Sequence, residues 1–140
     1  MQKLFFKLFV ATHVALFRAT KGRIGSKMRG GQVLLLTTTG HKSGKARSVP
    51  VMQFVDDGRR FVIASAAGSP AHPAWFKNLS AHPDVTVEVP GERYSAQAKV
   101  LSSAERAPIW NKVVAMAPDF GAYEKKAGGR EIPVVELKRA

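Results

Sequence analysis

A short basic turn is the segment of this sequence best suited to holding an anion. Residues 40–47 read GHKSGKAR and lie between two apolar runs. Glycine lets backbone N–H groups turn toward an anion, while the lysines and the arginine supply charge and the serine a hydroxyl. The segment is not a Walker A loop, because Ala46 stands where a magnesium-binding Ser or Thr is needed and a strand is expected to follow. A phosphate-binding turn and a solvated basic hairpin are both open interpretations.

A second candidate segment combines small residues with the expected start of a helix. Residues 64–68 read ASAAG, and residues 73–78 read PAWFKN. Small side chains allow a flat ring to approach the backbone closely, and a helix N-terminus favours a nearby anion. Trp75 is by itself better explained as a core residue. Asn78 would either bind a phosphate or cap a neighbouring loop.

Other catalytic residue sets are missing from the sequence. There are no cysteines, which excludes thiol catalysis and disulfides. The four histidines lack the spacing of metal ligands, so no metal site is expected. There is no Gly-x-Ser-x-Gly elbow and no carboxylate pair suited to acid–base work. An enzyme with this composition needs a cofactor for its chemistry, and a redox cofactor fits that condition.

The positive charge is concentrated near the N-terminus. The net charge is +12, from 22 basic and 10 acidic residues, and ten Lys or Arg residues precede Asp56, which is the first acid. This asymmetry predicts an anionic partner near the first third of the chain, whether a phosphate ligand, a membrane surface or nucleic acid. A general solubilising charge is the simpler alternative.

The first 17 residues are rich in Leu, Phe and Val, but Lys7 and His13 interrupt them and they are too few to span a bilayer, which takes about 20 apolar residues. No signal-peptide cleavage site is evident, so the expected location is the cytoplasm. Residues 1–21 predict either a basic amphipathic helix on the inner membrane face or a helix that caps the core of the domain. The cationic stripe of this helix consists of Lys3, Lys7, Arg18 and Lys21, and Val10 and Val14 share it.

The hydrophobic pattern predicts a mostly β domain. Strands are expected at residues 32–38, 48–55, 61–66, 85–89, 94–101 and 132–137, and helices at 72–80 and from a capping box at Ser102 and Glu105 to about residue 116. Asp57-Gly58 predicts a hairpin turn, and Pro50 an edge or bulge. About six antiparallel strands with two or three helices suit a small closed or split barrel at residues 31–140, preceded by a helix and linker at 1–30.

Four segments together resemble the deazaflavin-dependent nitroreductase family. They are ALFRATKGRIGSKMRG at 15–30, LLLTTTGHKSGKARSVPV at 34–51, HPAWFKNLSAHPDVTVEV at 72–89 and REIPVVEL at 130–137. The resemblance implies a split β-barrel of the flavin-reductase type that binds coenzyme F-420 (8-hydroxy-5-deazaflavin). It further implies hydride transfer from the reduced coenzyme to an electron-poor acceptor such as a quinone, a nitroaromatic or an activated enone.

The resemblance also implies the residues of the site. The phosphate and lactyl-glutamate tail of the coenzyme would be held by His41, Lys42, Ser43, Gly44, Lys45, Arg47, Ser48, Val49, Pro50, Val51 and Met52. The ring and its side chain would be lined by Ile63, Ala64, Ser65, Ala66, Ala74, Trp75, Phe76, Lys77, Asn78 and Phe120. Ser65 and Tyr123 are the candidate catalytic residues. Tyr123 would orient the substrate, donate a proton or serve only as an aromatic lid.

Some positions depart from the family pattern. His41 replaces a frequent arginine, and Ala66 replaces a lysine of nitroreducing relatives. Met52, Ala117 and Phe120 align with tyrosines of those relatives, whereas Tyr123 is retained. These differences predict a less polar and more open acceptor pocket.

Two alternative functions remain from the sequence. An FMN-binding reductase on the same barrel is one, although FMN has no glutamate tail to match the extended cationic turn. A basic membrane- or nucleic-acid-binding module is the other, but the strands lack the exposed aromatic residues that such modules interleave with Lys and Arg. A small-molecule acceptor is therefore the expected partner and nucleic acid is not; monomer and homodimer are both open.

Overall fold

The structure is a computed structural model that describes residues 2–23, 27–28, 31–65, 71–126, 128 and 131–140. Its helices are α1 (Gln2–Ala19), α2 (Ala74–Ala81), α3 (Ser103–Met116) and α4 (Asp119–Lys126). Its strands are β1 (Lys27–Met28), β2 (Gly31–Thr39), β3 (Ala46–Asp56), β4 (Arg59–Ile63), β5 (Asp84–Val89), β6 (Glu92–Val100) and β7 (Val134–Arg139).

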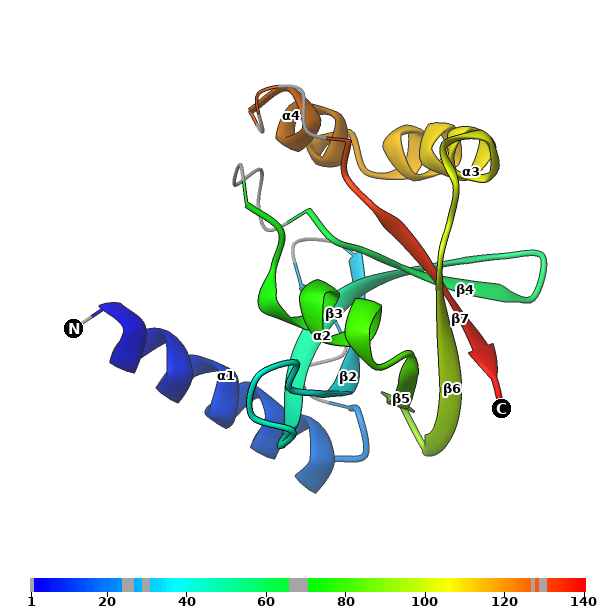
Figure 1. The fold of residues 1–140 in the computed structure, drawn as a ribbon. Coiled ribbons are helices and arrows are strands. Elements are labelled where there is room, and N and C mark those ends of the chain that lie inside the picture. The colour runs from blue at the N-terminus through cyan, green and yellow to red at the C-terminus, as the bar shows by residue number, and fades with distance from the viewer. Residues whose placement is uncertain (1, 24–26, 29–30, 66–70, 127, 129–130) are drawn as a thin grey trace.

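The strands form a closed antiparallel barrel. Their order is β1-β2-β3-β4-β7-β6-β5, and an additional pairing of β2 with β5 closes the sheet on itself. Because β2 pairs with β5, the six strands β2 to β7 have no free edge where the sheet closes. The short β1 pairs only two residues with β2. The helices lie around this barrel (Figure 1). The predicted mostly β barrel with flanking helices is confirmed.

The interior of the barrel explains the apolar run of β2. Leu34 and Leu36 point into a core of valines and leucines that also includes Leu79 of α2. Leu35 points outward and packs against Val14 and Phe17 of α1. Because both faces of β2 are covered, its sequence is apolar without alternation.

Helices α3 and α4 cover the outer face of β3, β4 and β7. Phe54, Phe61 and Val134 from these strands share a second cluster with Trp110 of α3 and Phe120 of α4. The predicted capping box at the start of α3 is confirmed by reciprocal hydrogen bonds: Glu105 N donates to Ser102 Oγ at 3.2 Å, and Ser102 N donates to Glu105 Oε1 at 3.1 Å.

Helix α1 turns its cationic stripe toward the barrel over its C-terminal half. Val14 and Phe17 are buried, and Arg18 pairs with Glu88 of β5 at 2.8 Å. The face that points away from the barrel is apolar and exposed, and it includes Leu4, Leu8, Phe9 and Leu16. The prediction that this helix caps the domain is therefore confirmed for its C-terminal half. No helix among the described residues is long and apolar enough to cross a bilayer.

Two predictions about local backbone structure are confirmed. Asp57 and Gly58 have φ values of 51° and 74°, as a two-residue hairpin turn requires. Pro50 pairs with Leu35 on β2, whereas β4 pairs only with the later part of β3, from Gln53 onward. Pro50 thus lies where no second strand needs its missing N–H.

Several predicted boundaries were wrong by a few residues. β4 ends at Ile63 instead of reaching residue 66, and β7 begins at Val134 instead of residue 132. Both ends coincide with Pro133, whose nitrogen cannot donate to the ladder, although its carbonyl accepts from Ala64 N at 3.0 Å. Pro73 is the N-cap of α2 and not part of its first turn. Helix α4 and the short β1 were not predicted.

Candidate functional site

The basic turn between β2 and β3 is fixed to α2 by one buried amide. His41 N donates to Asn78 Oδ1 at 3.0 Å, and His41 Nδ1 lies 2.6 Å from the same oxygen. Asn78 Nδ2 donates to Thr38 Oγ1 at 3.0 Å. Of the two roles that the sequence left open for Asn78, the observed contacts are those of a loop anchor. The amide joins residues 37 positions apart in the sequence.

Three backbone donors of the turn form hydrogen bonds within the turn itself. Gly40 N donates to Lys45 O, and Gly44 N donates to Gly40 O, both at 2.8 Å. Lys45 N donates to Ser43 Oγ at 3.2 Å. Gly44 has a φ of 70°, which favours glycine, and a Cβ at Gly40 would lie 2.5 Å from Ser43 Oγ. These three N–H groups are therefore not available to an anion, which leaves the side chains of Lys42, Lys45 and Arg47 among the predicted donors.

The cations of the turn have no acidic partners in the described part of the chain. Lys42, Lys45 and Arg47 are exposed, and none forms an ion pair with any residue that the structure describes. Their charge is therefore available to attract an anionic ligand from solution.

The strand that follows the turn divides the predicted tail-binding residues between two faces. Side chains alternate along a strand, and Val49 packs toward the barrel core whereas Met52 packs toward the outer cluster. Ser48 Oγ lies 2.7 Å from Thr37 Oγ1 and accepts from Arg18 Nη2 at 3.0 Å. One ligand on one face cannot contact all the side chains predicted at residues 48–52.

Arg18 is a link to the site that the sequence did not reveal. Its guanidinium donates to both carboxylate oxygens of Glu88, with Nη2 2.8 Å from Oε2 and Nε 3.1 Å from Oε1. The hydrogen bonds to Glu88 raise the pKa of Arg18, and burial opposes this only in part. Through its further bond to Ser48, Arg18 connects α1 to the strand that follows the basic turn.

The described residues predicted around the ring lie at the end of β4 and on α2, apart from Phe120, which lies on α4. Ile63 and Ala64 are buried, and Ser65 is half-buried. Trp75 and Phe76 are half-buried and pack against the barrel core, as expected for core residues. Ala74 and Lys77 are exposed at the surface of α2. Ala66 lies outside the described residues.

Residues predicted for the acceptor pocket and residues predicted for the coenzyme gather in one aromatic cluster. Phe120 and Tyr123 of α4 meet edge to face with ring centroids 5.8 Å apart. Met52 of β3 and Ile63 of β4 contact the same cluster, as does Ala117. The fold therefore brings together residues that are about 70 positions apart, and the wall they form is apolar apart from the tyrosine hydroxyl.

Arg106 is a structural residue of this region that the sequence analysis missed. Its Nε donates to the Ile132 carbonyl at 2.7 Å, its Nη2 donates to Glu124 at 2.9 Å, and its guanidinium lies 4.3 Å from the Trp110 ring centroid. It thereby ties α3 to α4 and to the start of β7. The available signal was its spacing, because Arg106 falls in the same helical stripe as Ile109, Trp110 and Val113.

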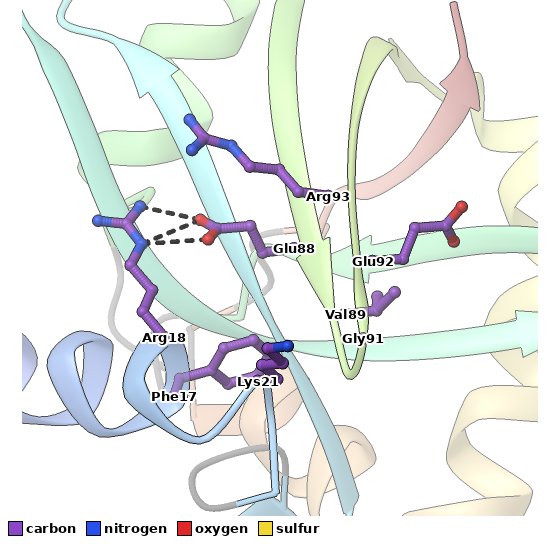
Figure 2. Close-up of a pocket in the computed structure, with 8 residues that line it drawn as sticks. All are labelled: Phe17, Arg18, Lys21, Glu88, Val89, Gly91, Glu92 and Arg93. Atoms are coloured by element: carbon purple, nitrogen blue, oxygen red, sulfur yellow. Dashed lines mark hydrogen bonds and ion pairs between the residues drawn. The ribbon is translucent and has the colours of Figure 1, made fainter.

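A separate cavity of about 440 Å³ lies between the end of α1 and the β5–β6 hairpin (Figure 2). None of the predicted site residues lines it. It is lined by Phe17, Arg18, Lys21, Glu88, Val89, Gly91, Glu92 and Arg93.

The residues of the predicted site fit a deazaflavin coenzyme. Three cations on the anchored turn, which form no ion pair with any described residue, match a polyanionic tail, and the side chains of Ala64 and Ser65 at the end of β4 are small. Among the described residues there is no group of three metal-ligating side chains.

Comparisons with known proteins agree with this chemistry. The family model that describes F-420H(2)-dependent quinone reductases matches residues 9–139. An F-420H(2)-dependent quinone reductase of Mycobacterium tuberculosis is 35% identical over 131 residues, which cover 91% of this chain and 87% of that protein.

Two solved structures are also similar. One is an F-420H(2)-dependent reductase (FDR-A), with 36% identity, a TM-score of 0.68 and coverage of 76% of this chain and 93% of that chain. The other is described as a domain-swapped dimer, with 34% identity, a TM-score of 0.71 and coverage of 91% of this chain and 94% of that chain.

Proposed function

Because the chain belongs to the F-420H(2)-dependent quinone reductase family, we propose that its basic turn binds the coenzyme tail while its α4 cluster receives the acceptor. The protein is an oxidoreductase that uses coenzyme F-420 and passes a hydride to an electron-poor acceptor such as a quinone. The assignment of these tasks to residues is the proposal.

The charge on the turn carries the proposal for the tail. Lys42, Lys45 and Arg47 are exposed and have no acidic partner among the described residues, so the phosphate and carboxylates of the coenzyme would be their counterions. Asn78 would hold the turn in place through its bonds to His41 and Thr38. Charge-assisted hydrogen bonds of this kind are stronger than neutral ones, so affinity should depend mainly on these three side chains.

The acceptor would lie against the cluster formed by Met52, Ile63, Phe120 and Tyr123. The bound reduced coenzyme supplies the hydride. Reduction of a quinone to a hydroquinone also consumes one proton, and we assign its delivery to the Tyr123 hydroxyl, because the other three side chains cannot donate one. Ser65, which follows Ala64 at the end of β4, would position the ring.

An anaerobic titration tests the coenzyme use and quinone reduction on which this proposal depends. Purified protein is mixed with reduced F-420 and a panel of quinones, and the recovery of oxidised-coenzyme absorbance is followed. Apoprotein is titrated in parallel with F-420 and with FMN. Binding of F-420 with quinone-dependent oxidation is expected; binding of FMN with no affinity for F-420 would contradict the assignment.

We also propose that the exposed face of α1 is the interface of a homodimer. Leu4, Leu8, Phe9 and Leu16 are 62%, 59%, 53% and 44% exposed, which leaves an apolar surface on a helix that packs through its opposite side. A relative that covers 91% of this chain has been solved as a domain-swapped dimer. An anionic membrane surface is the competing occupant of the same face.

Two measurements on the wild type and on a Leu8→Glu/Leu16→Glu variant separate the two occupants. Light scattering gives the oligomeric state, and sedimentation with anionic vesicles gives membrane binding. A wild-type dimer that becomes a monomer in the variant supports the homodimer. A wild-type monomer that sediments with anionic vesicles, with sedimentation lost in the variant, would instead favour membrane contact. The control variant is Lys138→Glu, because Lys138 is exposed on β7, away from α1.

A further inference from the structure

The cavity between α1 and the β5–β6 hairpin is built by two segments that are fixed to each other. Gly91 N donates to Lys21 O at 3.0 Å. A Cβ on Gly22 would lie 2.6 Å from Pro90 Cα, so the end of α1 and the hairpin turn are in close backbone contact. The cavity walls are therefore held in a defined position.

The charges around this cavity do not cancel. Glu88 accepts three hydrogen bonds from Arg18, and Glu92 pairs with Arg139 at 2.9 Å. Lys21 and Arg93 remain without an ion pair among the described residues. Figure 2 shows Arg93 reaching across from β6 toward Glu88 and Arg18, while Glu92 points the other way. The cavity therefore presents an excess of positive charge beside apolar side chains.

The conformation of Lys21 is unusual for a lysine. Gly22 N donates to Phe17 O at 2.8 Å and Lys21 N donates to Arg18 O at 3.3 Å, which is the hydrogen-bond pattern of a Schellman motif. Lys21 occupies the left-handed position of that motif, with a φ of 54°, where glycine is the preferred residue. A cation thus stands at the cavity at a position where the fold itself would favour glycine.

We propose that this cavity binds a phosphate-bearing ligand, whose negative charge Lys21 and Arg93 would attract from opposite sides of Glu88. A phosphate would take up the charge that Glu88 and Glu92 do not neutralise, and Arg is well suited to phosphate oxygens. Phe17 and Val89 are the apolar side chains that line the cavity, so the part of the ligand beside them would be apolar. The phosphate could belong to a small molecule or to a lipid headgroup. This site is distinct from the basic turn proposed for the coenzyme.

Two variants remove the charge in different ways. Lys21→Gly deletes a cation and places glycine where the backbone favours it, so the melting temperature should stay the same or rise. Arg93→Gln deletes the second cation on an exposed strand position. Lys138→Gln, at an exposed position on β7, is the control for loss of one positive charge.

Two probes distinguish the source of the phosphate. Inorganic phosphate is titrated at constant ionic strength while the amide resonances of residues 21, 22, 91 and 93 are followed. Sedimentation is measured in parallel with vesicles of phosphatidylglycerol and of phosphatidylcholine. The proposal is supported if binding weakens at least tenfold in Lys21→Gly and Arg93→Gln but not in Lys138→Gln. Binding of inorganic phosphate would identify a small-molecule phosphate as the source. Binding of phosphatidylglycerol vesicles without binding of inorganic phosphate would identify a lipid headgroup.

Three results would overturn the site. One is the absence of binding to either probe, and another is binding that the two variants do not change. The third is an equal loss of F-420 affinity in these variants and in turn variants, because the cavity would then be part of the coenzyme site. Failure of this proposal leaves coenzyme binding and quinone reduction intact, so it is distinguishable from failure of the proposed function.

Discussion

The basic turn and the α3–α4 layer differ in whether their cations are paired and buried. In the turn, Lys42, Lys45 and Arg47 are exposed and have no ion pair among the described residues. In the α3–α4 layer, the buried guanidinium of Arg106 pairs with Glu124 and donates to a backbone carbonyl. The difference separates two uses of a cation: unpaired charge is available for a ligand, whereas paired and buried charge fixes the fold. Binding and stability should therefore respond to different substitutions.

The largest expected effect is on coenzyme affinity. The double substitution Lys42→Glu/Arg47→Glu should raise the F-420 dissociation constant by about 100-fold or more, because each charged hydrogen bond contributes about 1.5–3 kcal/mol and reversal adds repulsion. The melting temperature should change little, since both side chains are exposed. Fluorescence titration measures the first effect and thermal unfolding the second.

The control for this variant is Lys7→Glu/Lys138→Glu, which makes the same change in net charge at exposed positions on α1 and β7. The tail-binding assignment would fail if the control weakens F-420 binding as much as the turn variant does. In that case the electrostatic field of the whole protein, and not the turn, would attract the coenzyme.

The reverse effect is expected in the α3–α4 layer. Arg106→Met should lower the free energy of unfolding by about 2–3 kcal/mol, because the Ile132 carbonyl would lose its buried donor. F-420 affinity should stay within about twofold of the wild type if the layer is remote from the tail site, a margin of about 0.4 kcal/mol. Urea unfolding and fluorescence titration are the measurements.

Glu124→Gln is the matched change on the other side of this ion pair. Glu124 is 40% exposed, so its loss of charge should cost less than about 1 kcal/mol. If Glu124→Gln were as destabilising as Arg106→Met, the ion pair and not the buried bond to Ile132 would account for the stability of the layer.

The features that could be predicted from the sequence are those that local pattern determines. The β2 run, the Asp57-Gly58 turn and the Ser102–Glu105 capping box are each specified by neighbouring residues, and all are present. Helix α4 was missed because it is short and contains Gly121, so it depends on tertiary contacts such as Phe120 in the outer cluster.

The site shows the same division. The cationic turn was evident because its charges are adjacent in sequence, and Asn78 was named as a candidate. The contacts that organise the site were not evident, because His41 and Asn78 are 37 residues apart and Arg18 and Ser48 are 30 apart. Such pairs depend on how the barrel closes, and local periodicity does not encode that.

A smaller effect is expected from Tyr123→Phe. The substitution keeps the ring that packs against Phe120 and removes the hydroxyl assigned to proton delivery. We expect kcat for quinone reduction to fall by about tenfold, below the usual range for general acids because water can replace the donor in an open pocket. The F-420 dissociation constant should not change. An unchanged kcat would mean that Tyr123 is only an aromatic lid.

The smallest effect concerns a surface charge in the α3–α4 layer, and it tests whether paired charge there acts only on stability. The hydrogen bond from Lys99, together with those from Ser102, lowers the pKa of Glu105 from 4.5 to about 2. Because the folded-state pKa is depressed, the stabilisation is present above pH 4.5 and is lost as the pH falls toward 2. Glu105→Gln should therefore melt slightly below the wild type at pH 6, and the difference should vanish near pH 2. A difference that stays constant with pH would assign the effect to the geometry of the helix cap, whereas a change in F-420 affinity at pH 6 would contradict the separation of binding from stability.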